Sequence, residues 1–302
     1  LGKDFSHQRV ATIKNALCDT SGRIVDSDNC HVFRNGGCDI NKNSKFSMKD
    51  NTPKYHKVIT IAMPWGFETW HFVGEALVGL AYVQNIETYK IHVTAKTKFV
   101  LEWLRVVGVH EHQVITGTVF AKTLLIPELG KCGNPAPQQI RWLKEKISQY
   151  LPPSKQDKHV LLVKRTKKRI QSNWPSILQV VKRFSPNVVV HDDSNLPSVQ
   201  QQLENFRNAH TVIAPHGAGL LNIWASHPNT KVIEFMDTTT MNLCYARLAY
   251  ILGLNYNAIE MKSSMNRVSE VFQENAISHK ISPQITNNFQ IHVLTMNRAK
   301  SL

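Results

Sequence analysis

Short apolar segments alternate with helical patterns through the second half of the chain, and this alternation constrains the fold more than any other feature. The apolar segments have the length of strands and occupy residues 159–163, 188–190, 211–214 and 232–235. The helical patterns follow them in turn, at residues 175–184, 197–208, 219–226 and 241–252. Strands that are apolar throughout and are joined by helices are typical of a parallel sheet covered on both faces. The sequence therefore predicts an α/β fold.

The first half of the chain shows a similar alternation after an irregular beginning. Residues 1–55 are rich in Asn, Asp, Lys and Gly and have little periodicity, which indicates an irregular arm. Strands are predicted at residues 58–62, 88–94, 113–115 and 121–126, and helices at residues 69–83, 98–107 and 137–150. We therefore expect a Rossmann-like domain in this half as well.

The paired prolines Pro152 and Pro153 mark the expected domain boundary, because they end the preceding helix and favour an extended chain. The sequence predicts an N-terminal Rossmann-like domain at residues 1–151, irregular arm included, and a second Rossmann-like domain at residues 152–281. We expect the two domains to face each other across a cleft. A last periodic segment predicts a C-terminal helix at residues 282–302 that packs on the first domain.

The charge balance narrows the possible partners without choosing among them. The chain has 36 Lys and Arg against 22 Asp and Glu, a net charge of +14 that favours anionic partners. Nucleic acid, a nucleotide-linked substrate and an ordinary basic surface all fit this balance.

The expected compartment follows from features that the sequence lacks. No stretch reaches the roughly 20 apolar residues of a transmembrane helix, and no Asn-x-Ser/Thr sequon occurs. We therefore expect a cytoplasmic protein without a transmembrane segment. A removed leader or anchor would instead place it in the lumen of the endoplasmic reticulum or Golgi, where Cys30 and Cys38 could form a disulfide.

A turn rich in small residues follows the predicted strand at residues 211–214. Its sequence is Pro215-His216-Gly217-Ala218-Gly219-Leu220-Leu221-Asn222, and it leads into a predicted helix. Ligands of parallel sheets bind at the carboxyl ends of strands, and glycines and amide groups at a helix start suit a phosphate. The turn predicts a phosphate site, with tight packing between strand and helix as the alternative.

A basic cluster, Lys164 to Arg169, follows the predicted strand at residues 159–163. Arg165 and Arg169 are the candidates for a bidentate clamp on a diphosphate, whereas the lysines are expected to be solvated. This cluster and the small-residue turn would together neutralise a departing diphosphate, a role that a divalent metal fills elsewhere. The segment Asp26-Ser27-Asp28 has the Asp-x-Asp form used by metal-dependent sugar transferases. Because it precedes any nucleotide-binding sheet along the chain, we expect no metal site.

Several of these segments resemble the family 61 glycosyltransferases, which include plant xylosyltransferases and the protein O-GlcNAc transferase of the endoplasmic reticulum. The resemblance extends from Leu161 to Tyr256, and its most specific part is the His216-Gly217-Ala218-Gly219 core. The segment from Trp70 to Leu77 resembles a more variable N-terminal element of that family. The small size and the absence of an anchor and of sequons are similar to the capsid-glycan xylosyltransferases of large algal viruses, which would imply the host cytoplasm. One departure is Leu221, where the family often carries threonine.

The resemblance implies two Rossmann-like domains in the GT-B arrangement and inversion at the anomeric carbon. It also implies a UDP-sugar donor, with xylose favoured, a glycan or glycoprotein acceptor, and neither a metal nor another cofactor.

An inverting transfer needs a base that deprotonates the acceptor hydroxyl. Glu75 is the leading candidate, because burial can raise the pKa of a carboxylate toward neutrality. His71 is the second candidate, four residues earlier and so on the same helical face.

Further residues at strand ends are candidates for donor binding. His216 is placed near the phosphates or the transferred sugar, with a structural hydrogen bond in the turn as the alternative. Asn222 lies on the following helix and is expected to reach the phosphates. Glu234 is expected to accept the ribose hydroxyls, and His191 and Asp192 to border the nucleobase.

Three other functions are alternatives to the transferase. A nucleic-acid-binding protein would need aromatic residues among the basic ones, and the cluster from Lys164 to Arg169 contains none, so no nucleic-acid partner is expected. A nucleotide-dependent oxidoreductase or methyltransferase would carry Gly-x-Gly-x-x-Gly after an early strand, which this chain does not. A non-catalytic sugar-binding or nucleotide-binding module stays open.

Overall fold

The computed structural model describes residues 3–4, 9–28, 30, 32–33, 50–154, 158–167, 170–171, 173–237 and 242–261. The chain divides into two compact units between Pro152 and Pro153, one residue beyond the boundary expected from the sequence. The predicted C-terminal helix, residues 282–302, lies outside the described residues.

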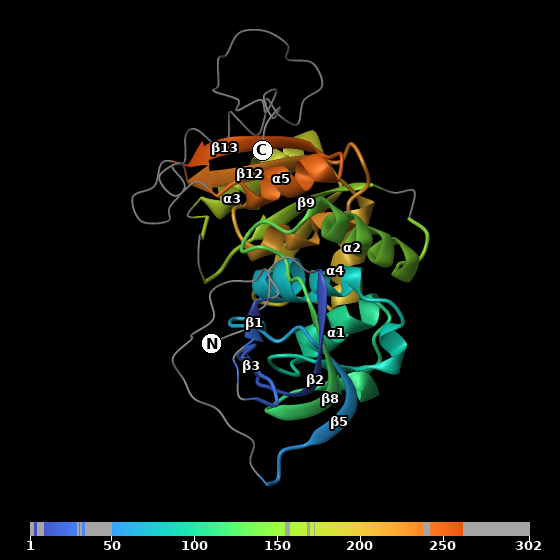
Figure 1. The fold of residues 1–302 in the computed structure, drawn as a ribbon. Helices are drawn as coiled ribbons and strands as arrows, with labels where there is room; N and C mark the ends of the chain where they lie inside the picture. Colours follow the sequence, from blue (N-terminus) through green and yellow to red (C-terminus); the bar gives the residue numbers. More distant parts are fainter. Residues whose placement is uncertain are drawn as a thin grey trace. The chain divides into compact units, whose positions relative to one another are not determined.

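The first unit contains a six-stranded sheet in the order β3-β2-β8-β5-β6-β7. Its strands are β2 (Val10–Cys18), β3 (Ile24–Val25), β5 (Lys54–Thr60), β6 (Lys90–His92), β7 (Val114–Ile115) and β8 (Val119–Pro127). Two further short strands, β1 (Lys3–Asp4) and β4 (Val32–Phe33), pair in parallel with each other. Figure 1 shows β2, β8 and β5 side by side in this sheet.

One side of this sheet departs from the parallel arrangement that the sequence predicts. Strands β8, β5, β6 and β7 run parallel to one another, but β2 is antiparallel to both β8 and β3. The expectation of an irregular arm over residues 1–55 is therefore wrong for Val10–Cys18. Its alternation breaks after Lys14, because Lys14 and Asn15 are both exposed and the next three residues, Ala16 to Cys18, are all buried. The hydrogen bonds that make this segment a strand come from pairing with β8, which the local sequence does not predict.

Helical segments follow the strands of the first unit much as predicted. They are η1 (His71–Ala76), η2 (Leu77–Tyr82), η3 (Ile86–Thr88), α1 (Lys98–Val106), η4 (Glu111–Gln113) and α2 (Pro137–Tyr150). The predicted helix at residues 69–83 is not a regular α-helix, since η1 is π-helical and η2 is a 3₁₀ helix. Short π-helical turns are rare and recur at functional sites.

The second unit contains a five-stranded parallel sheet in the order β10-β9-β11-β12-β13. Its strands are β9 (His159–Lys164), β10 (Val188–Asp192), β11 (Ala209–Pro215), β12 (Lys231–Asp237) and β13 (Asn255–Met261). The sequence predicts the first four of these strands. It does not predict β13, because the polar residues of this strand interrupt its apolar pattern. An α/β fold is thus present in both units.

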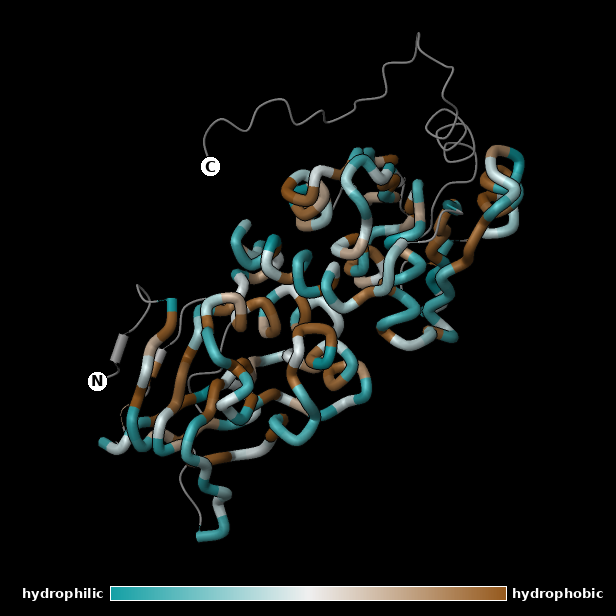
Figure 2. The backbone as a smooth tube through the Cα atoms, turned by 90° about the vertical axis from the view of Figure 1, so that its right-hand side faces the viewer, coloured by the Kyte–Doolittle hydropathy of each residue, from teal (hydrophilic) through white to brown (hydrophobic). Residues whose placement is uncertain are grey.

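Four helical segments connect the strands of the second unit: α3 (Trp174–Phe184), α4 (Val199–Asn208), η5 (Ala218–Ala225) and α5 (Cys244–Ile251). Helix α3 buries Ile177 and Val181 against Leu162, Ile213 and Phe235 of the sheet. Each such side chain contributes about 1.5–3 kcal/mol when fully buried. In Figure 2 the hydrophobic stretches, in brown, follow the strands, in agreement with this buried core.

Two expectations about the chain as a whole can be compared with the described residues. None of the helices among them is long and apolar enough to cross a membrane. Cys30 is not disulfide-bonded, so the pairing with Cys38 that a secreted protein would allow is wrong. Cys38 itself lies outside the described residues.

Candidate functional site

The strand order of the second unit reverses between β9 and β11. The chain runs from β9 outward to β10, then returns to the other side of β9 and continues through β11, β12 and β13. Ligands of open parallel sheets bind outside the carboxyl ends of the strands at such a reversal. The basic cluster follows β9 and the small-residue turn follows β11, so the fold brings the two predicted phosphate-binding segments to this point.

Acidic residues after β10 pair with the basic residues after β9. Lys164 Nζ donates to Asp192 Oδ2 at 2.8 Å, and this bond together with those from Ser194 lowers the pKa of Asp192 to about 2. Asp193 accepts from the amide and hydroxyl of Thr166. The sequence predicts a solvated Lys164, but this lysine is bonded to Asp192. Asp192 in turn is occupied by protein partners.

The Arg165 guanidinium lies at the edge of the protein interior, with 13% of its side chain exposed. Its Nε is 2.9 Å from Asp193 Oδ2, the distance of an ion pair, but the angle is not that of a hydrogen bond. Within the described part of the chain, Nε and Nη1 have no hydrogen-bond partner. Arg165 therefore retains donors for an anionic ligand. Arg169, the other predicted half of the clamp, lies outside the described residues.

A buried asparagine at the start of α3 also lacks partners. Gln171 fixes the chain before it, since its amide donates to Val163 O at 2.7 Å and accepts from Arg165 N. Asn173 is 4% exposed, and neither its Oδ1 nor its Nδ2 has a hydrogen-bond partner among the described residues. Buried polar groups are rarely left unpaired without a ligand or water. The sequence signal for this residue is its place in the family-like segment, which by itself predicts no role for it.

The small-residue turn combines a ligand-compatible backbone with a packing requirement. Gly217 has φ of 139°, a conformation that side chains rarely allow, and it is the N-cap residue of η5. Ala218 follows it, so the first amides of η5 lie at the carboxyl end of β11. A Cβ on Gly219 would lie 2.8 Å from Val163 Cγ1 of β9, so this glycine is needed for packing. The packing explanation therefore applies to Gly219, whereas the phosphate site at the turn stays a prediction.

His216 is held by a buried carboxylate. Its Nδ1 is hydrogen-bonded to Glu234 Oε1, and Tyr256 donates its hydroxyl to Glu234 Oε2 at 2.6 Å. Burial and the Glu234 carboxylate raise the pKa of Tyr256. Because Glu234 is fully buried and both its oxygens accept from protein groups, its contacts differ from the predicted contact with ribose. This geometry instead orients His216 at the end of β11.

Two other predicted donor residues make contacts inside the protein. Asn222 is 4% exposed, and its amide donates to Gln202 of α4 at 3.1 Å, because η5 packs on that helix. His191 is also buried and packs edge-on against Phe206, with ring centroids 5.4 Å apart. These contacts differ from the predicted ones with phosphate and nucleobase.

Burial of His191 makes the stability of the second unit sensitive to acid. Desolvation lowers the pKa of His191 to about 4, below the ordinary histidine value of 6.5. The unfolded chain therefore binds one proton more than the folded chain between these values, so stability falls as the pH is lowered through this window. We expect protonation of His191 to lower the free energy of unfolding by up to about 3 kcal/mol at the acid end of this pH window.

Urea unfolding of wild-type protein and His191→Leu between pH 7 and pH 4 measures this effect. The difference in unfolding free energy between the two should shrink as the pH falls, whereas His56→Gln, at an exposed histidine, should track the wild type. Parallel pH profiles for wild type and His191→Leu would contradict the assignment.

The first unit contains a second pair of histidine and glutamate. His71 Nδ1 lies 3.1 Å from Glu75 Oε2 within η1, the contact expected from their spacing of four residues. The loop after β8 completes the surroundings of Glu75, since Gly133 N donates to Oε1 at 3.2 Å and Gly130 N donates to the Glu75 carbonyl at 2.9 Å. Desolvation raises the pKa of Glu75, although the bonds from His71 and Gly133 oppose this shift.

The two base candidates differ in their exposure. The Glu75 side chain is fully buried, whereas 26% of the His71 side chain is exposed. A carboxylate oxygen accepts, so Nδ1 of His71 carries a proton and Nε2 is the basic nitrogen of the neutral ring. The geometry favours His71 as the group that meets a substrate and Glu75 as the group that orients it.

The Asp-x-Asp segment is part of a turn. Asp26 is 5% exposed, and its Oδ1 accepts from the amides of Asp28 and Cys30 at 3.0 and 2.9 Å. Among the residues that the structure describes, no group of three or more His, Cys, Asp or Glu side chains could hold a metal ion.

Comparison with known proteins agrees with the resemblance noted from the sequence. The chain is similar to the beta-1,2-xylosyltransferase RCN11 of Oryza sativa subsp. japonica, with 32% identity over 77 residues. That alignment covers 26% of this chain and 14% of the length of the rice protein.

Two solved structures from Thermotoga maritima, a flavo di-iron protein variant and a flavoprotein, are each 16% identical to the chain. Each alignment covers 56% of this chain, and the two cover 41% and 42% of the respective solved chains, with TM-scores of 0.33 and 0.32. Likeness at this level supports no argument. The sequence profile of Glycosyltransferase 61, in contrast, matches residues 69–233, more than half of the chain. This match includes both the His71–Glu75 pair and the turn at His216, and the protein belongs to glycosyltransferase family 61.

Proposed function

We propose that the protein is an inverting glycosyltransferase that moves a sugar, with xylose favoured, from a UDP-sugar to a glycan or glycoprotein without a metal. The family and the xylosyltransferase name of the rice relative support this class of reaction. The observation that carries the donor site is the set of buried polar groups on Arg165 and Asn173 that have no hydrogen-bond partner among the described residues, next to the reversal of strand order.

In this proposal the donor diphosphate binds at the carboxyl ends of β9 and β11. Arg165 supplies donors that no described residue uses, and the amides at the start of η5 supply further ones. His216, oriented by Glu234, adds a hydrogen bond to the phosphates or the sugar. Fixed donors of this kind stabilise the charge that develops on a leaving diphosphate.

The first unit supplies the base, as it does in the proposed GT-B arrangement. His71 Nε2 takes the proton of the acceptor hydroxyl while that oxygen bonds to the anomeric carbon. The bond between this carbon and the diphosphate oxygen breaks, and UDP leaves with the electron pair from the opposite face of the sugar. Glu75 holds Nδ1 and stabilises the imidazolium that forms.

Titration of the chain with UDP, once with magnesium and once with EDTA, tests the donor site. We expect the same affinity in both, and strict dependence on magnesium would overturn the metal-free mechanism. No UDP binding in either condition would overturn the transferase proposal and favour a non-catalytic module.

The variant Arg165→Ala should weaken UDP binding by about 10- to 100-fold, because a hydrogen bond from a charged donor contributes about 1.5–3 kcal/mol. Calorimetric titration measures the change, and Arg183→Ala, an exposed arginine of α3, is the control that should bind UDP normally. Equal affinity of Arg165→Ala and wild type would mean that the cluster is only a surface feature.

A further inference from the structure

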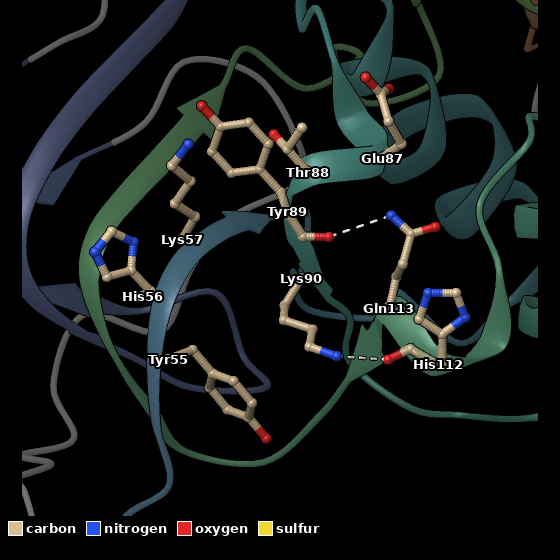
Figure 3. Close-up of a pocket in the computed structure, with 9 residues that line it drawn as sticks. All are labelled: Tyr55, His56, Lys57, Glu87, Thr88, Tyr89, Lys90, His112 and Gln113. Carbon is tan, nitrogen blue, oxygen red and sulfur yellow. Dashed lines mark hydrogen bonds between the residues drawn. The ribbon is translucent and has the colours of Figure 1, made fainter.

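A concave surface in the first unit has no part in the chemistry proposed above. The cavity has a volume of about 430 Å³, within the usual range of ligand pockets, about 300–1,000 Å³. Two tyrosines, Tyr55 and Tyr89, and two lysines, Lys57 and Lys90, line it together with Glu87 and His112. Figure 3 shows these side chains around the pocket.

The strand directions place this cavity away from Glu75. Val58 pairs with Lys90 and Ile91 pairs with Val114, so the lining residues lie at the amino ends of the parallel strands β5, β6 and β7. Glu75 is bonded to Gly130 and Gly133, just beyond the carboxyl end of β8, which runs parallel to β5. The cavity and Glu75 therefore lie at opposite ends of the parallel strands of one sheet.

Local contacts hold the two lysines in place. Lys90 Nζ donates to the His112 carbonyl at 2.7 Å, and Lys57 Nζ lies 5.6 Å from the centroid of the Tyr89 ring. Gln113 fixes the backbone between them by donating to the Ile86 and Tyr89 carbonyls. Figure 3 shows the bond of Lys90 to His112 and that of Gln113 to Tyr89 as dashed lines.

The positive charge of the pocket is not compensated within the described part of the chain. Neither Lys57 nor Lys90 forms an ion pair with a carboxylate there. Glu87 is the single acidic residue of the lining, so the two lysines leave a net positive charge. An ammonium with remaining donors favours carboxylate, sulfate or phosphate oxygens.

The tyrosines give the pocket its second chemical character. Tyr55 and Tyr89 are half-buried, and each presents an apolar ring with a polar hydroxyl at its end. Such rings cover the apolar C–H face of a sugar, while hydroxyl and ammonium groups meet its oxygens. An anionic ligand that also has an apolar face fits this lining better than a bare inorganic ion.

We propose that this pocket binds an anionic saccharide, a sugar residue that carries a carboxylate, sulfate or phosphate group. The inference rests on the proposed function in one respect, that such a sugar would belong to the acceptor glycan and hold it away from the transfer site. The pocket then selects acceptors by a charged sugar distant from the reacting hydroxyl.

Calorimetric titration of the full chain with four probes tests the proposal. The probes are a disaccharide containing glucuronic acid, a sulfated disaccharide, the corresponding neutral disaccharide and inorganic sulfate. We expect at least one charged disaccharide to bind about ten-fold or more tightly than the neutral one and than sulfate. Equal binding of sulfate and charged disaccharide, or no binding of either disaccharide with a charge, would overturn the proposal.

Variants locate the binding in this pocket. Lys57→Gln and Lys90→Gln should each weaken binding of the charged disaccharide about ten-fold. Tyr89→Ala should weaken it to the same extent, while Tyr89→Phe should retain most of the affinity. Lys98→Gln removes the same charge from a side chain on α1 that is 86% exposed and should change nothing. Unchanged binding in both pocket lysine variants would place the saccharide elsewhere and overturn the assignment.

UDP titration of the same variants separates this inference from the proposed function. The pocket variants should bind UDP as wild type does, since the donor site lies in the other unit. UDP binding without saccharide binding would remove the pocket proposal alone, and saccharide binding without UDP binding would remove the transferase proposal alone.

Discussion

Replacement of His71 by glutamine should lower the rate of sugar transfer by about 10³-fold and leave UDP affinity within about two-fold of wild type. The reason is that His71 exposes part of its ring, whereas Glu75 behind it is fully buried and holds Nδ1 at 3.1 Å. Loss of the imidazole removes the group that accepts the acceptor proton but touches nothing in the donor site. Single-turnover transfer and UDP titration measure the two effects separately.

Glu75→Gln distinguishes an orienting role from a direct one. The amide can still accept from Gly133 but does not stabilise an imidazolium, so we expect a loss of about 10²- to 10³-fold and a changed pH profile of the rate. Residues that act as one unit are not additive, so the double variant should be no slower than His71→Gln. A full rate for His71→Gln together with an inactive Glu75→Gln would return the role of base to Glu75.

Gly130→Ala should lower the rate of transfer by about 10²-fold, although this residue touches no substrate in the proposed mechanism. A Cβ at this position would collide with the Gly74 carbonyl and would lie 3.0 Å from Glu75 Cα, both of them backbone atoms that cannot rotate away. The loop after β8 must then move away from η1 and release its bond to Glu75. Misplacement of a catalytic group by about 1 Å has an effect of this size.

Crowding of the backbone should also lower the unfolding free energy of Gly130→Ala by about 1–3 kcal/mol. Gly133→Ala is the matched control in the same loop, because a Cβ there meets nothing within 4 Å and only its φ of +69° is unfavourable. It should cost about 1 kcal/mol or somewhat more, and little activity. The two variants are compared by urea unfolding and by turnover, and equal losses of activity in both would contradict the role of close packing at Gly130.

The parallel sheet of the second unit follows from its sequence because each strand from β9 to β12 carries its own signal. Val160 to Val163 and Val212 to Ala214 are apolar without interruption, as strands buried on both faces must be. The order of those strands does not follow from any one segment. The reversal between β9 and β11, which brings Arg165 and His216 to one edge, depends on pairing between residues about 50 positions apart.

The first unit shows where local patterns are insufficient. Strand β2 was expected to be an irregular segment, because its hydrogen bonds come from β8, more than 100 residues later. In the same way, the spacing of His71 and Glu75 predicts their contact, but which of the two is exposed depends on the packing around η1. The local sequence therefore predicts which side chains meet within a helix but not which of them the rest of the unit buries.

By itself, the sequence determined the α/β class, the segments that follow β9 and β11, and the family resemblance that the profile match confirms. These follow from neighbouring residues, through hydrophobic periodicity and turn chemistry. The tertiary structure alone decided that Glu234 and Asn222 are occupied by Tyr256, His216 and Gln202. It also decided that Arg165 and Asn173 have donors without a hydrogen-bond partner among the described residues. The physical reason is that hydrogen-bond satisfaction and burial are properties of contacts between distant segments, which become defined when the sheet assembles.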